Sequence, residues 1–141
     1  MISVLALAGV AAGCGGGDDS DSLTKAEFVK QASDVCLKVN KETQKNLEAA
    51  VQAQEGVPPS KQSEEQLVNN IVIPALEKQS EKLKELGAPE GDEDQIAAIT
   101  DELDKVAKEA EENPVGVASQ SDPFLKVDQM MKDYELEACR H

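Results

Sequence analysis

The sequence of 141 residues predicts one all-α domain, an antiparallel four-helix bundle over residues 23–141. Apolar side chains recur every three or four residues in four separate stretches, which is the period of one buried helix face. Short segments rich in Gly and Pro separate these stretches. Aromatic residues make up only 2% of the chain, so the core must consist mainly of Leu, Ile, Val and Ala, which suit helix packing.

The first predicted helix begins after Thr24 and ends near Gln54. Thr24 and Glu27 form an S/T-x-x-E capping box, in which each side chain bonds the backbone N–H of the other residue. The segment 56–59, Gly-Val-Pro-Pro, then stops the helix. We expect one face to be buried along the whole helix, and its apolar stripe consists of Phe28, Ala32, Val35, Val39, Leu47 and Ala50.

The second predicted helix begins near Ser60 or Ser63 and stops at Gly87, with Pro89 beyond it. Pro74 lies inside this helix, where it removes a backbone donor and clashes with the carbonyl one turn back. Because apolar periodicity continues on both sides, we expect a kink rather than a break. The predicted buried face consists of Leu67, Ile71, Ala75, Leu83 and Leu86.

The third predicted helix begins at Asp92, which repeats the capping pattern with Gln95, and closes at residues 113–114, Asn-Pro. Its apolar seam consists of Ile96, Ile99, Leu103, Val106 and Ala110. The small residues of segment 115–121 predict a loop.

The fourth predicted helix spans 122–138. Asp122 is its predicted N-cap, and Pro123 occupies the first helical position, where its fixed φ is favourable. The apolar positions again alternate at three and four: Phe124, Val127, Met131, Tyr134 and Ala138.

Residues 1–13 predict a lipoprotein signal peptide. An apolar run from Ile2 is too short to span a bilayer and ends in Ala-Ala-Gly before Cys14, the pattern of a bacterial lipobox. Cys14 would then carry a diacylglyceryl thioether and hold the protein on the outer face of the cytoplasmic membrane. Two features depart from the usual pattern, since no Lys or Arg precedes the run and Ala11 stands where Leu is most usual. Ordinary signal-peptidase cleavage and an uncleaved apolar N-terminus are the alternatives.

Residues 14–22 are the predicted lipidated cysteine and an acidic tether. From residue 15 to residue 22 the chain contains only Gly, Asp and Ser, a composition that behaves as a flexible, solvated linker. The helical domain would therefore stay near the membrane without having to touch it.

The chain has three cysteines, an odd number that would leave one thiol over in a secreted protein. If Cys14 carries lipid, Cys36 and Cys139 remain as one candidate pair in an oxidising compartment. A redox role is the alternative to a structural bond, but neither sulfur lies in a motif that lowers a thiol pKa. In the predicted bundle a bond between them requires the C-terminal tail to reach back to the first helix.

Charge and side-chain inventory favour a non-enzymatic protein. A net charge of −14 disfavours nucleic acid as a partner, since binding nucleic acid depends on cationic side chains. The only histidine is His141, the last residue, which we expect to be solvated and without catalytic function. We predict no metal and no cofactor, since the acidic clusters at 18–21 and 92–94 lack calcium-loop spacing and Met130 and Met131 lack an internal His partner for haem.

A gap between helices at the Pro74 kink is the candidate ligand site. Ile71, Ile73 and Leu76 would line it and could hold a small apolar ligand. Two functions follow as hypotheses. The first is an envelope lipoprotein that interacts with or scaffolds a protein partner. The alternative is a lipoprotein that binds a small ligand or metal near the kink.

Several short motifs together resemble a known pattern. They are the segments 26–28 (Ala-Glu-Phe), 73–76 (Ile-Pro-Ala-Leu), 83–86 (Leu-Lys-Glu-Leu), 91–93 (Gly-Asp-Glu) and 134–136 (Tyr-Glu-Leu), with Cys36, Pro89 and Cys139. The chain thereby resembles small, largely uncharacterised lipoproteins of high-GC Gram-positive (actinobacterial) bacteria. The resemblance implies an envelope location and a disulfide between Cys36 and Cys139, and it carries no activity. The proteins of that family usually have Gly where this chain has Glu135, so the resemblance does not fix the conformation of the final turn.

Overall fold

The computed structural model describes residues 23–141; the predicted signal peptide, Cys14 and the tether lie outside these residues. The described part is helical and contains no strand, so the predicted all-α class is confirmed. The elements are α1 (Lys25–Ala53), α2 (Lys61–Leu67), the π-helical segment η1 (Val68–Val72), α3 (Ile73–Leu86), α4 (Glu93–Glu112), α5 (Pro114–Ala118), α6 (Leu125–Asp133) and the 3-10 turn η2 (Glu137–Cys139).

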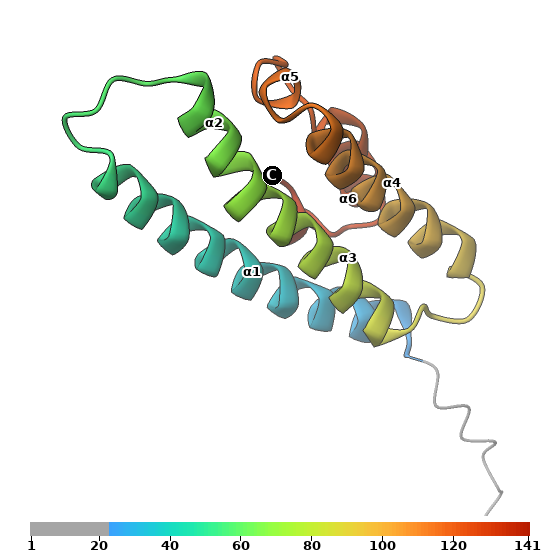
Figure 1. Cartoon of the computed structure of the whole chain (residues 1–141). Helices are drawn as coiled ribbons and strands as arrows, with labels where there is room; N and C mark the ends of the chain where they lie inside the picture. Colours follow the sequence, from blue (N-terminus) through green and yellow to red (C-terminus); the bar gives the residue numbers. More distant parts are fainter. Residues whose placement is uncertain (1–22) are drawn as a thin grey trace, which may run out of the picture.

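The helices form an antiparallel, bundle-like arrangement (Figure 1). The continuous helix made by α2, η1 and α3 returns alongside α1, and α3 packs against both α1 and α4. α6 packs against α4, and η2 packs against α1. The largest fully buried side chains of the core are Phe28, Leu76, Leu83, Ile99, Leu103, Val127, Met131, Tyr134 and Leu136.

The first half of α1 follows the prediction and the second half does not. The capping box is present, with Thr24 N donating to Glu27 Oε2 at 3.0 Å and Glu27 N donating to Thr24 Oγ1 at 3.3 Å. Burial on α1 ends at Val39. Leu47 is 44% exposed and Val51 56% exposed, so the expectation of a face buried up to Gln54 is wrong. η1 and α3 lie beside this half of α1 but leave Leu47 and Val51 exposed.

The helix that contains Pro74 stays continuous, as predicted. The turn before the proline widens into the π-helical segment η1, whose capping bond runs from Ile73 N–H to the carbonyl of Val68, five residues back. A wider turn leaves more room for the proline ring beside the preceding carbonyls. The irregularity expected at Pro74 is therefore a π-helical segment just before it.

The ends of α4 differ from the expected signals. Asp92 precedes α4, but its carboxylate makes no capping bond to that helix. The segment expected as a loop at 115–121 instead contains the short helix α5. Asn113 caps this helix, since its Oδ1 accepts from Gly116 N at 3.0 Å, and Pro114 takes the first helical position.

The last helix is much shorter than predicted. α6 spans only Leu125–Asp133, whereas the sequence pattern predicts helix over 122–138. A Schellman motif ends it, with Leu136 N donating to Met131 O at 2.8 Å and Glu135 N donating to Lys132 O at 3.0 Å. Leu136 and Met131 are both fully buried, which supplies the hydrophobic contact of this motif. Glu135 occupies the left-handed position of this motif, with φ 68°. Glycine is the usual residue at that position, so the sequence lacks the usual signal for the end of the helix.

Replacing this residue by glycine tests the turn. Glu135→Gly is expected to raise the free energy of unfolding by about 0.5–1 kcal/mol, because a left-handed backbone is costly for a residue with a Cβ. The Lys25 ion pair that it removes spans 3.6 Å at a solvent-exposed site and contributes little. Urea denaturation checks the change. Lys132→Gly, inside α6, is the control and should lower the free energy of unfolding. An equal decrease in the free energy of unfolding for both variants would contradict the left-handed conformation at Glu135.

A nearly buried ionic contact ties α6 to α4. Glu102 is 8% exposed, and Lys126 from α6 donates to its carboxylate. Lys105, one turn along α4, donates at 3.3 Å. The Lys126 hydrogen bond is the main reason that the pKa of Glu102 lies below its ordinary value, with Lys105 acting in the same direction. The carboxylate therefore favours its ionised, paired form.

None of the helices within residues 23–141 has both the length and the apolar composition needed to cross a bilayer.

Candidate functional site

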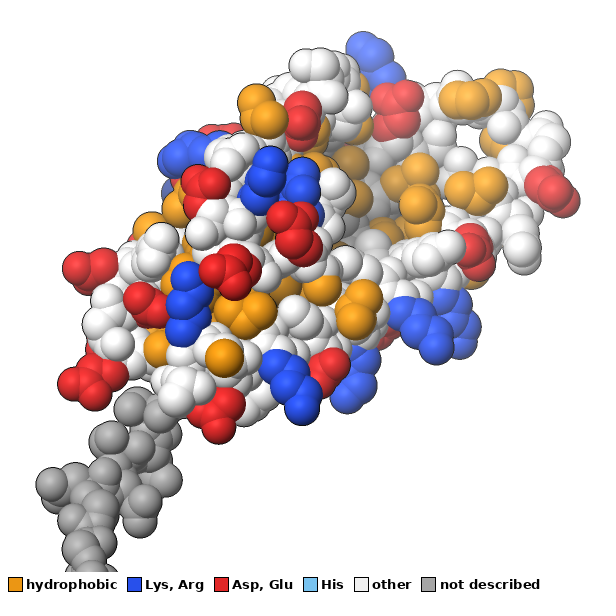
Figure 2. Space-filling view, turned by 180° about the vertical axis from the view of Figure 1, so that it is seen from behind, with side chains coloured by type: hydrophobic (Ala, Val, Ile, Leu, Met, Phe, Trp, Pro, Cys, Tyr) orange, Lys and Arg blue, Asp and Glu red, His pale blue; other side chains and the backbone are white. Residues whose placement is uncertain are grey.

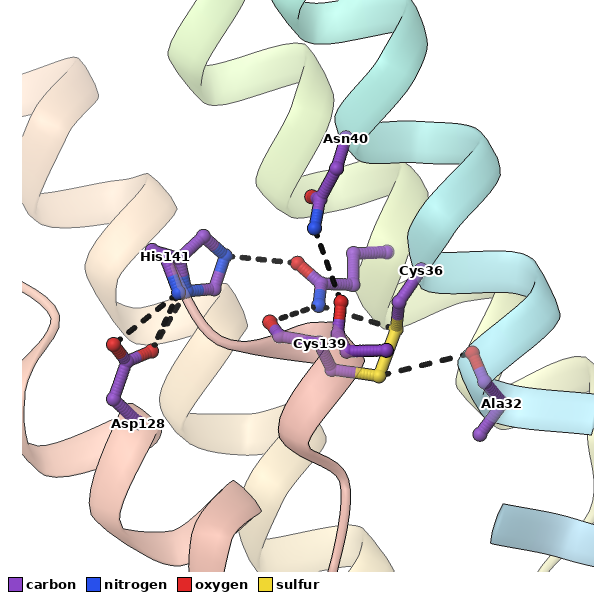
Figure 3. Close-up of a disulfide and its surroundings, with 8 residues drawn as sticks. Ala32, Cys36, Asn40, Asp128, Cys139 and His141 are labelled. Atoms are coloured by element: carbon purple, nitrogen blue, oxygen red, sulfur yellow. Dashed lines mark hydrogen bonds and ion pairs between the residues drawn. A yellow bond between two sulfur atoms is a disulfide. The ribbon is translucent and has the colours of Figure 1, made fainter. Parts of the chain in front are cut away.

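A disulfide joins the two ends of the described domain. Cys36 of α1 and Cys139 of η2 lie 103 residues apart in the sequence with their Cα atoms at 4.8 Å, and neither residue is exposed. The predicted pairing is confirmed. The turn at Glu135 makes this pairing geometrically feasible, because it ends α6 and lets η2 pack against α1. Figure 3 shows Cys139 bonded to Cys36 of α1.

Residues 134–141, which we call the C-terminal strap, are held by buried polar contacts as well as by the disulfide. Gln79 of α3 is only 1% exposed, and its Nε2 donates to Cys139 O at 2.7 Å. Asn40 of α1 donates through Nδ2 to Ala138 O at 3.0 Å. Both bonds satisfy backbone carbonyls that the short η2 turn leaves without helical partners.

His141 belongs to this network: the residue as a whole is exposed, as expected, but its side chain is held by contacts that the sequence did not predict. Its side chain is 16% exposed. Nδ1 lies 3.0 Å from Asp128 Oδ1, and Nε2 lies 2.8 Å from Gln79 Oε1. The amide nitrogen of Gln79 faces a carbonyl, so its oxygen faces the ring, and both ring nitrogens meet acceptors. Both ring nitrogens are therefore held in contacts within the domain.

The start of the strap is fixed by Tyr134, which is fully buried. Its hydroxyl donates to Asp92 Oδ2 at 2.5 Å, which explains why this carboxylate does not cap α4. Burial, and then the Asp92 carboxylate, raise the pKa of Tyr134. Phe28 packs edge-on against the ring with centroids 5.9 Å apart, and Lys25 Nζ lies 4.6 Å from the ring centroid. The strap is thus anchored at both ends.

A groove of about 500 Å³ lies between the second half of α1, the helix η1–α3 and the strap; we call it the α1–α3 groove. Figure 2 shows a hollow between the helices with hydrophobic side chains inside it. The apolar lining consists of Val39, Leu47, Val72, Ala75, Leu76 and Phe124. The polar lining consists of Asn40, Thr43, Gln44, Gln79, Arg140 and His141.

The three residues predicted to line one ligand site do not meet in a single cavity. Leu76 lines the α1–α3 groove. Ile71 lines a separate hollow of about 60 Å³ beside Pro74. Ile73 packs into a small satellite cluster with Val68, Ala110 and Val117. The cavity near Pro74 is therefore smaller than a usual ligand site, and the larger groove lies on the strap side of the helix.

Arg140, His141 and Phe124 line the groove although the sequence pattern did not predict them as site residues. The sequence did contain an indication of the groove. The apolar stripe of the first helix continues to Leu47, and a short final helix leaves that residue uncovered. The expectation of a full fourth helix assigned that stripe to the core. No metal site competes with the groove within residues 23–141, where no three His, Cys, Asp or Glu side chains are placed to hold an ion.

Fold and site together define a class: an all-α, bundle-like domain closed by a buried disulfide, with an apolar groove beside the disulfide-bonded strap. Comparisons with protein-family models, with curated proteins and with solved structures find no match to this chain.

Proposed function

We propose that this protein is an extracytoplasmic lipoprotein, held through Cys14 on the outer face of the cytoplasmic membrane, whose helical domain binds a ligand rather than catalysing a reaction. The lipobox pattern before Cys14 and the Gly, Asp and Ser composition of residues 15–22 support the anchor. The disulfide supports an oxidising compartment, because such bonds persist outside the cytosol.

The α1–α3 groove is the observation that carries the binding role. Its volume of about 500 Å³ lies within the usual range for small-molecule sites, and apolar side chains form half of its lining. Its strap-side wall is held by the disulfide and by the Gln79 bond to Cys139 O. A preformed site loses less conformational freedom on binding.

A protein partner in the envelope is the second candidate. It is supported by three exposed apolar side chains on the free end of α1 and the following loop, namely Leu47, Val51 and Val57, exposed to 44%, 56% and 60%. Exposed apolar side chains that cluster on one surface can mark a protein interface. The groove favours the small ligand as the first candidate, since a ligand can be enclosed there on several sides.

Membrane partition tests the anchor. Cys14→Ser is expected to move most of the protein from the membrane fraction to the soluble fraction, because the thiol that would carry lipid is removed. The comparison uses ultracentrifugation of cell envelopes followed by immunoblotting. Cys36→Ser is the matched control, since it removes a different thiol and should leave membrane association unchanged. Equal membrane partition of Cys14→Ser and the parent would show that lipid on Cys14 does not hold the protein.

A further inference from the structure

The charge of the α1–α3 groove differs from that of the rest of the protein. The chain has 28 acidic residues among 141, yet no Asp or Glu lines this groove. Four other hollows on the described surface each have at least one carboxylate in their lining, including Glu42, Glu81, Asp122 and Asp101. Among these five hollows only the α1–α3 groove has no carboxylate in its lining, although the carboxylates of Glu137 and Asp128 contact its lining residues Arg140 and His141.

Arg140 supplies positive charge in the same groove. It is the only arginine of the chain, and its side chain is 40% exposed. One guanidinium nitrogen donates to Glu137 Oε2 at 2.8 Å, an exposed pair of the kind that contributes little stability. Arginine has five N–H donors, so the others remain for a planar anion such as a carboxylate.

The apolar wall runs lengthwise along α1. From Val39 to Leu47 this helix rises about 12 Å, and both residues line the groove. Phe124 also lines the groove, and its ring stacks on His141 with centroids 4.7 Å apart. The lining is thus a trough for an elongated apolar chain, with the guanidinium on the strap side.

We propose that the α1–α3 groove binds a single-chain anionic amphiphile of the fatty-acid class, with the acyl chain against Leu47 and Phe124 and the carboxylate paired with Arg140. The guanidinium donors of Arg140 that Glu137 does not occupy select the anion, and the volume of about 500 Å³ suits one chain rather than a two-chain lipid. This assignment rests on the proposed binding role but not on the membrane anchor.

Calorimetric titration with laurate, below its micelle concentration, tests the assignment. The full chain carrying Cys14→Ser is used, so binding is measured apart from anchoring. We expect one laurate per chain, and about tenfold weaker binding of dodecanol, which has the same chain without the charge. Arg140→Gln should weaken the binding of laurate about tenfold and leave the binding of dodecanol unchanged.

Matched variants separate the groove from the rest of the surface. Leu47→Gln changes a groove residue and should weaken the binding of both ligands. Leu125→Gln replaces a leucine outside the groove that is 66% exposed, and it should weaken the binding of neither ligand. Lys132→Gln controls for the loss of a cation elsewhere. Circular dichroism confirms that each variant folds.

Three results would overturn the assignment. Absence of laurate binding by folded protein would exclude the ligand, and equal binding of laurate and dodecanol would exclude the anionic class. A concentration-dependent dimer that Leu47→Gln dissociates, together with no laurate binding, would assign the groove to a second copy of the chain. None of these results bears on partition of the Cys14→Ser protein, which tests the anchor independently.

Discussion

Cys139→Ser is expected to lower the melting temperature of the oxidised protein by about 10–20 °C. The bond closes a loop of about 100 residues, and the chain-entropy account gives up to about 4.7 kcal/mol for a loop of that size. In a domain of this length each kcal/mol shifts the melting temperature by about 2–5 °C. Thermal denaturation followed by circular dichroism, without reductant, measures the shift.

The controls for this variant isolate the bond from the side chain. Cys36→Ser should melt at the same temperature as Cys139→Ser, and the parent protein in reducing agent should approach both. Cys14→Ser should melt as the parent does, because that thiol lies outside the bonded pair. Identical melting temperatures for Cys139→Ser and the oxidised parent would contradict a stabilising role for the disulfide.

Phe28→Ala is expected to lower the free energy of unfolding by about 3–5 kcal/mol, the usual loss when a buried aromatic side chain leaves a cavity. Phe28 is fully buried and lies against Tyr134 at the start of the strap. Leu47→Ala is the matched comparison on the same helix and the same sequence stripe. Leu47 is 44% exposed, so its truncation should cost less than about 1 kcal/mol. Urea denaturation measures both values.

The difference between these two positions tests where the core ends on α1. A large loss at Leu47 would mean that the second half of α1 is covered in solution, and dependence of that loss on protein concentration would identify a second copy as the cover. Similar small losses at both positions would contradict the packing of Phe28 in the core.

Local signals in the sequence predicted the helical elements well. The capping box at Thr24, the stop at Gly87 and the helical continuity through Pro74 all depend on neighbouring residues within about one turn. Such interactions are encoded within a few positions of the chain. The disulfide partners were also predictable, because only two cysteines remain once Cys14 is assigned to lipid.

The last segment was mispredicted because its stop signal is unusual. The apolar positions of 122–138 continue at helical spacing through Tyr134 and Ala138, and Glu135 has no conformational preference for a turn. Its left-handed backbone is stabilised by contacts distant in the sequence, chiefly the burial of Leu136 and the bond from Cys139 to Cys36. The apolar periodicity of one segment does not depend on those contacts, so it could not predict the turn.

The sequence by itself determined the helical class and most helix boundaries, since periodicity and capping are local properties. The pairing of Cys36 with Cys139 followed from the cysteine number on the premise that Cys14 carries lipid. Only the tertiary structure decided that the chain turns back at Glu135, that burial on α1 ends at Val39, and that Arg140 joins an apolar groove. These features depend on tertiary contacts between segments that are distant in the sequence, and short-range sequence patterns do not encode such contacts.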